Sequence, residues 1–150
     1  MNIYLLNSNI EGVETLLLSI INPEIDKKAK LTAKAIVGFV LNNNQPISEN
    51  NVRINPAFLD HFHKTIIFFA QFNDEIIHLI EQQQNGFIYV RDQRNKEDEK
   101  SEDIIGSFEI KNGELVHASY VPNPHYKFIT ATGGFELQEE LEALLYSTLY

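Results

Sequence analysis

The chain contains no cysteine. This absence excludes disulfides, thiolate metal sites and cysteine nucleophiles, and it suits a reducing compartment. Basic residues are scarce, because 12 Lys and Arg stand against 21 Asp and Glu and the formal net charge is -9. General attraction to phosphate backbones or anionic lipid head groups is therefore disfavoured. We expect neither nucleic acid nor a membrane surface as a partner.

Long apolar runs are also missing. The longest covers residues 35–41, far short of the roughly 20 residues that cross a bilayer. The first residues carry no basic segment, and polar residues interrupt the apolar stretch that follows, so no secretory signal is expected. The 150 residues are 43% hydrophobic and 22% charged, as in a typical folded domain. We expect a single cytoplasmic domain over residues 1–150.

Helical spacing of apolar residues is prominent in the first half of the chain, and it predicts a helical part over about residues 8–85. Ser8 to Glu11 has the pattern of a capping box, in which both side chains bond backbone N–H groups at a helix start. Pro23 is typical of the first turn of a second helix, which should end near Leu41. The polar residues 42–51 then predict a surface loop.

A second pair of signals begins at Asn55-Pro56, where an N-cap residue precedes a proline. Apolar residues follow at alternating steps of three and four as far as Ile80. This spacing predicts either one long helix to about Gln84 or two helices that are broken near Asn73.

From residue 87 the pattern changes to strands. Residues 87–90 are β-branched and aromatic, and residues 104–110 and 114–120 flank Asn112-Gly113, the dipeptide that two-residue type I′ hairpins favour. That turn would place Lys111 opposite Glu114, which has the opposite charge, and Ile110 opposite Leu115.

These elements predict an α+β fold. N-terminal helices should pack on a small antiparallel β-meander, over about residues 86–121, and a C-terminal helix over about residues 136–149 should close the domain. A small sheet needs one covered face, and the Phe-rich segment 58–72 is expected to cover it.

Histidines are the side chains of this sequence best suited to bind a metal ion or to act in catalysis. His61 and His63 are two residues apart and would point about 200° away from each other on a helix, so they cannot bind one metal ion. The common enzyme signatures are absent from the sequence. We expect no catalytic residue, no metal site and no cofactor.

A small hydrolase-like enzyme stays an alternative. His117, Glu109 and Ser119 lie on neighbouring predicted strands, and a His held by a carboxylate near a hydroxyl can support acid-base chemistry. The predicted register places His117 opposite Phe108, which favours a structural role for this histidine instead.

Charged residues of both signs are concentrated between the first predicted strand and the hairpin, where they should project into solvent. An exposed acidic edge accelerates encounter with a basic protein, although a solvated loop with weak ion pairs is the alternative. The aromatic and proline-rich residues 120–128 follow, and Tyr is a favoured interface anchor. The candidate partner-binding residues are Arg91, Arg94, Glu97, Asp98, Glu99, Glu102, Asp103, Tyr120, His125 and Tyr126.

Three segments, residues 86–94, 102–109 and 119–125, resemble the shared core of small uncharacterised bacterial proteins. Some of those proteins are similar to immunity proteins that neutralise a cognate toxin in contact-dependent or polymorphic toxin systems. The resemblance implies a non-enzymatic inhibitor, and the acid excess suggests a basic toxin domain as its protein partner. An adaptor or a subunit of an oligomer is a further alternative.

Overall fold

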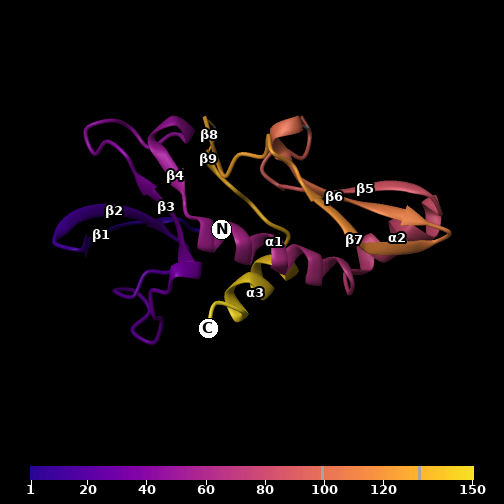
Figure 1. Cartoon of the computed structure of the whole chain (residues 1–150), viewed down its shortest axis with the longest axis horizontal. Helices are drawn as coiled ribbons and strands as arrows, with labels where there is room; N and C mark the ends of the chain where they lie inside the picture. Colours follow the sequence, from indigo (N-terminus) through magenta and orange to yellow (C-terminus); the bar gives the residue numbers. More distant parts are fainter. Residues whose placement is uncertain (99, 132) are drawn as a thin grey trace.

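The computed structural model, which describes residues 1–98, 100–131 and 133–150, begins with a four-stranded antiparallel sheet. Its strands are β1 (Tyr4–Ile10), β2 (Val13–Ser19), β3 (Ile36–Val40) and β4 (Val52–Ile54), in the spatial order β1-β2-β3-β4 (Figure 1). The predicted α+β class is confirmed, but the helices predicted over residues 8–41 are wrong.

The turn between β1 and β2 explains why the capping-box pattern misleads. Glu11 and Gly12 have φ angles of 51° and 83°, and two successive residues with positive φ form the type I′ turn of a tight hairpin. Ser8 lies within β1 and pairs with Thr15 of β2. The hydroxyl therefore starts no helix.

The segment after β2 also differs from the predicted second helix. Pro23 leads into a loop that ends in the 3-10 helix η1 (Ala33–Ala35), and the β-branched and aromatic residues of β3 follow. Gly38 lies in β3 against β4, where an added Cβ would stand 2.7 Å from the carbonyl oxygen of Arg53. The second 3-10 helix, η2 (Glu49–Asn51), precedes β4.

Two helices follow, α1 (Pro56–Ala70) and α2 (Asp74–Gln83). The Asn55 side chain accepts a hydrogen bond from the Ala57 N–H, and the Asn73 side chain accepts one from the Ile76 N–H. Each asparagine thus caps its helix. Of the two predicted alternatives, the break near Asn73 is the one observed.

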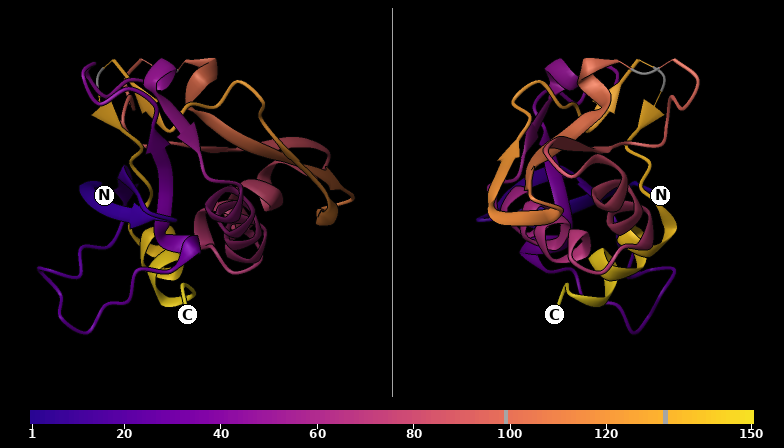
Figure 2. Two further views of the ribbon diagram at one scale, coloured as in Figure 1. Left: turned by 60° about the vertical axis from the view of Figure 1, so that its left-hand side comes forward. Right: turned by 90° about the vertical axis from the view of Figure 1, so that its right-hand side faces the viewer.

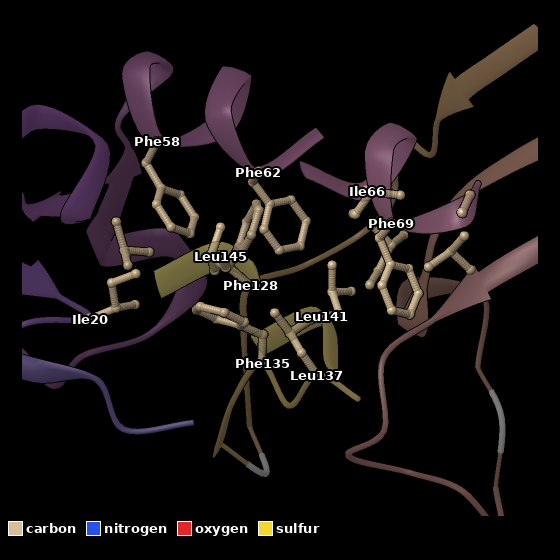
Figure 3. Packing of buried hydrophobic residues seen from close by; sticks show 14 of the residues in the cluster. Ile20, Phe58, Phe62, Ile66, Phe69, Phe128, Phe135, Leu137, Leu141 and Leu145 are labelled. Carbon is tan, nitrogen blue, oxygen red and sulfur yellow. The ribbon is translucent and has the colours of Figure 1, made fainter. Parts of the chain in front are cut away.

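The core lies along α1, which runs between the two larger sheets with α3 (Glu139–Ser147) beside it (Figures 1 and 2). Figure 3 shows the side chains of α1 pointing toward α3 and toward Phe128 and Phe135. The rings of Phe62 and Phe128 are 4.9 Å apart, and those of Phe58 and Phe128 are 5.5 Å apart, both edge to face. One cluster of buried residues includes side chains from both sheets.

The second sheet has the order β5-β6-β7, formed by β5 (Gly86–Arg91), β6 (Ile104–Lys111) and β7 (Glu114–Pro122). Asn112 and Gly113 have φ angles of 51° and 74°, which confirms the type I′ turn. Lys111 pairs with Glu114 and Ile110 with Leu115, as predicted.

Among the helices of the described residues, none has the length and apolarity needed to cross a bilayer.

The hairpin register changes beyond Val116. Glu109 pairs with Val116, but Ser107 pairs with Val121, so residues 117–120 lie opposite the single residue Phe108. The expected pairing of His117 with Phe108 is therefore wrong. The extra residues form a bulge in β7 that interrupts the ladder. Beyond it lie the short 3-10 helix η3 (Ser101–Asp103) at the start of β6 and the two-residue strands β8 (Ile129–Thr130) and β9 (Gly133–Gly134).

Candidate protein-binding surface

A buried polar cluster lies at the end of β5, where the sequence predicted an exposed loop. Its members are Asp92, Arg94, Asp103 and Tyr126, and the side chains of Arg94 and Asp103 are only 5% and 3% exposed. The Nε of Arg94 donates to Oδ1 of Asp103 at 2.7 Å, and Nη2 donates to the carbonyl oxygen of Glu102 at 3.0 Å. The guanidinium also lies over the Tyr126 ring, 5.4 Å from its centroid.

Asp92 connects this cluster to two further segments. Its Oδ2 accepts a hydrogen bond from the Tyr126 hydroxyl at 2.7 Å, and its Oδ1 accepts bonds from the backbone N–H groups of Arg94 and Glu136, at 2.9 and 3.1 Å. Nη1 of Arg94 stands 3.6 Å from Oδ2 of Asp92. The cluster therefore joins the end of β5, η3, the segment after β7 and the segment before α3.

The pKa values of the two carboxylates of the cluster are shifted in opposite directions. Burial raises the pKa of Asp92, although its bonds to Tyr126 and Arg94 act the other way. Burial alone would also raise the pKa of Asp103, but the hydrogen bonds from Arg94 and Asn95 outweigh it, so that pKa lies below its usual value. Asp103 is thus the carboxylate that the guanidinium holds ionised.

The other predicted site residues are dispersed around this cluster. Glu97 and Asp98 are exposed, as is His125, and Glu99 lies outside the described residues. Glu102 is half-buried and its carboxylate stands 3.5 Å from Nζ of Lys127. Only part of the predicted loop therefore projects into solvent, because the charges at its two ends, Arg94 and Asp103, are paired and covered.

Tyr120 and Tyr126, predicted as interface anchors, both point inward. The Tyr120 hydroxyl lies 2.7 Å from Nδ1 of His63 on α1, and its ring is 4.9 Å from that of Phe108. Tyr126 is half-buried under Arg94, and burial raises the pKa of its hydroxyl well above its usual value. These rings stabilise the fold and do not form a free aromatic surface.

Exposed aromatic side chains lie instead on the outer face of the second sheet. Phe87 and Tyr89 alternate along β5 with the buried Ile88 and Val90, and they are 57% and 51% exposed. The register places them on the same face as Ser107 and Glu109 of β6 and as Val116 and Val121 of β7. We call this surface the outer sheet face, defined by Phe87, Tyr89, Ser107, Glu109, Val116 and Val121.

The outer sheet face also exposes Val121, and Arg91 borders it. Val121 is 60% exposed, and the Arg91 guanidinium lies 5.7 Å from the centroid of the Tyr89 ring. Large apolar side chains that are half exposed and share one face of a sheet are typical of interaction surfaces. The predicted site residue Arg91 thus belongs to the margin of the outer sheet face.

Charge is distributed unevenly along the chain. Residues 1–54 contain five acidic and five basic side chains, whereas residues 55–150 contain 16 acidic and seven basic ones. The whole net charge of -9 therefore belongs to the part that carries α1, α2, α3 and the second sheet. A partner with positive potential would be drawn to this part of the molecule.

The hydrolase alternative receives no support from the geometry. The Ser119 hydroxyl accepts a hydrogen bond from the Glu109 N–H at 2.7 Å and donates to the carbonyl oxygen of Val116, so it is engaged in the bulge. The Glu109 carboxylate stands 3.5 Å from Nζ of Lys111, and His117 is exposed. No group of metal-ligating side chains is assembled among the described residues.

An open groove of about 460 Å³ lies between α2 and β7, where Ile77, Ile80 and Leu115 form its apolar part and Glu81 and His117 also line it. Neither Ser119 nor Glu109 lines it. Of the three residues of the hydrolase alternative, only His117 lines this groove.

The chain gives no match to any family model, curated protein or solved structure. The resemblance over residues 86–125 therefore stays a prediction.

Proposed function

We propose that this protein is a non-enzymatic protein-binding domain of the immunity type, which binds a basic toxin domain through its outer sheet face. The observation that carries the proposal is the exposure of Phe87, Tyr89 and Val121 on one face of the β5-β6-β7 sheet, within residues 55–150, which hold the net negative charge.

The apolar side chains of this face would supply the binding energy. Half-exposed Phe and Tyr side chains still have large areas to remove from water, at roughly 25 cal/mol per Å². Aromatic residues are also enriched among the few residues that dominate the energetics of interfaces. Phe and Tyr have only two side-chain dihedral angles to restrict, so Phe87 and Tyr89 lose little conformational freedom when a partner covers them.

The acidic residues would act mainly before contact. Glu97 and Asp98 are exposed in the loop that follows β5, and Glu109 lies on the outer sheet face. Such charges attract a basic protein over distances of about one Debye length, roughly 8 Å at physiological ionic strength. They would therefore accelerate association more than they slow dissociation.

The buried cluster around Arg94 would position the acidic loop without contacting the partner. Arg94 and Asp103 fix the two ends of the loop, so Glu97 and Asp98 are held near the end of the sheet. In this proposal, Arg94, Asp103 and Tyr126 are positioning residues, whereas Arg91, Glu97 and Asp98 belong to the binding region.

The test uses the product of the reading frame that neighbours this gene, purified as an inactive toxin domain. Association and dissociation rates are measured at two salt concentrations for Phe87→Ala, Tyr89→Ala and the wild type. We expect the two variants to dissociate at least tenfold faster, with association little changed. Phe72→Ala is the matched control, because Phe72 is 64% exposed at the turn between α1 and α2.

Charge is tested separately. Replacing Glu97 by Gln and Asp98 by Asn should slow association and weaken its dependence on salt. The control replaces Glu24 by Gln and Asp26 by Asn, an equal charge change at exposed residues within residues 1–54, which carry no net charge. If the neighbouring product binds and every variant binds like the wild type, the outer sheet face is not the interface. If that product does not bind at all, the immunity function is wrong.

A further inference from the structure

β1 is an edge strand that lacks the features by which the other edges of the two larger sheets avoid pairing with another strand. It is seven residues long, Tyr-Leu-Leu-Asn-Ser-Asn-Ile, with no charged residue and no proline. It pairs with β2 over all seven residues without a bulge, and it ends the β1-β2-β3-β4 order. Natural proteins usually protect such edges with charges, prolines, bulges or very short strands.

The remaining edges of the two larger sheets show those devices. β4 has three residues and includes Arg53. β7 carries the bulge at residues 117–120 and ends at Pro122. On β5, the Gln83 side chain donates to the Phe87 carbonyl oxygen at 3.1 Å, and the register shifts at Val90 and Arg91. β1 differs from all three.

The hairpin geometry determines which backbone groups of β1 point outward. In a two-residue hairpin, the pair next to the turn exchanges hydrogen bonds, and here that pair is Ile10 and Val13. Because the pattern alternates, Ser8 and Leu6 also bond β2. The N–H and C=O groups of Leu5, Asn7 and Asn9 therefore point away from the sheet.

These three residues are self-complementary in an antiparallel arrangement. If Asn7 pairs with Asn7 of a second copy, then Leu5 pairs with Asn9 of that copy, and Asn9 with its Leu5. All outward backbone groups are then used, and the interface has the two-fold symmetry of a closed dimer.

The charge distribution favours a second copy as the occupant of this edge. Two chains of charge -9 repel each other, but residues 1–54 contain equal numbers of acidic and basic side chains. Contact between two N-terminal sheets therefore brings neutral parts together and keeps the acidic parts at a distance. A strongly basic or acidic peptide would find no opposite charge on β1.

We infer that two copies of this chain associate through antiparallel pairing of β1 with β1, centred on Asn7, to form one continuous sheet of eight strands. The outer sheet face lies at the other end of the molecule, beyond α1 (Figure 1). The inference therefore goes beyond the proposed function and does not depend on it.

The first experiment measures the mass of the full chain by sedimentation over a range of concentrations. The wild type should show twice the monomer mass of 17.2 kDa. Asn7→Lys places two like charges at the symmetry axis and should shift the protein to the monomer. Asn43→Lys, at an exposed residue of the loop after β3, makes the same charge change within residues 1–54 and should leave the dimer intact. Circular dichroism must show that both variants are folded.

The second experiment identifies the edge. Because the chain has no cysteine, Asn7→Cys introduces a single thiol that a short thiol-specific cross-linker can join to its copy. Paired residues in an antiparallel sheet have Cα atoms about 5.5 Å apart, so Asn7→Cys should cross-link quantitatively and Asn43→Cys should not. A wild type that stays monomeric up to about 1 mM overturns the inference, as does a dimer in which Asn7→Cys fails to cross-link. Neither result concerns the neighbouring gene product.

Discussion

Replacing Asp103 by Asn tests whether the buried ion pair between Arg94 and Asp103 stabilises the fold. The substitution keeps the shape of the side chain but removes the charge that faces Nε of Arg94 at 2.7 Å. The guanidinium stays buried, with Asp92 at 3.6 Å as the remaining carboxylate. A charge-assisted hydrogen bond contributes about 1.5 to 3 kcal/mol, and breaking a buried pair costs about 3 to 5 kcal/mol in total. We expect the free energy of unfolding to fall by about that amount.

Asp92→Asn is the matched control in the same cluster. An Asn oxygen can still accept from the N–H groups of Arg94 and Glu136, and its amide can donate to the Tyr126 oxygen. The guanidinium also keeps Asp103. The expected loss is about 1.5 kcal/mol or less, as for one altered hydrogen bond.

The assay is urea unfolding followed by circular dichroism, at several pH values. Because the pKa of Asp103 is lowered in the folded protein, its contribution is complete above about pH 4, the unfolded value. It is lost as pH falls through the folded pKa, so the wild type and Asp103→Asn should converge in acid. The pKa of Asp92 is raised, so the wild type should lose stability relative to Asp92→Asn as pH rises from about 4. Equal losses for the two variants near neutral pH would refute the assignment of Asp103 as the essential partner.

Three other substitutions test packing, turn geometry and titration. Phe69→Ala should cost about 3 to 5 kcal/mol, because it opens a cavity in the shared core; a loss below about 1 kcal/mol would contradict the packing of α1. Gly113→Val should lower the melting temperature, since a β-branched residue would have to adopt a φ of 74° and its Cβ would lie 2.7 Å from Oε1 of Gln84. An unchanged melting temperature would contradict the type I′ turn. Burial lowers the pKa of His63, so the wild type should lose stability as pH falls below about 6.5. His63→Gln should remove that part of the pH dependence in the same unfolding assay, and an unaltered profile would contradict it.

The elements that short local patterns determine are the ones that the sequence predicts correctly. Asn55 and Asn73 cap their helices through residues two and three positions away, and Asn112-Gly113 determines its own turn. These elements were predictable from short segments. The N-terminal sheet was not, because Leu17 and Leu18 are buried on opposite faces of β2 and hide the alternation that identifies a strand. Glu11-Gly12 is also a less typical type I′ dipeptide than Asn-Gly.

The site was harder to predict than the fold for a similar reason. No local pattern around Tyr126 shows that its hydroxyl donates a hydrogen bond to a carboxylate 34 residues away. The sequence therefore predicts that all charged residues of the loop are exposed, although several are paired. The alternation of Phe87 and Tyr89 with two aliphatic residues in β5 was a readable signal, since period two places them on one face.

The long separations within the Arg94 cluster also have a consequence for folding kinetics. Asp92 bonds residues 34 and 44 positions further along the chain, and such contacts need the closure of long loops. We therefore expect the cluster to form after the folding transition state, once β5, β6 and β7 have paired. Its bonds would then act as a barrier to opening, so Asp103→Asn should accelerate unfolding far more than it slows refolding.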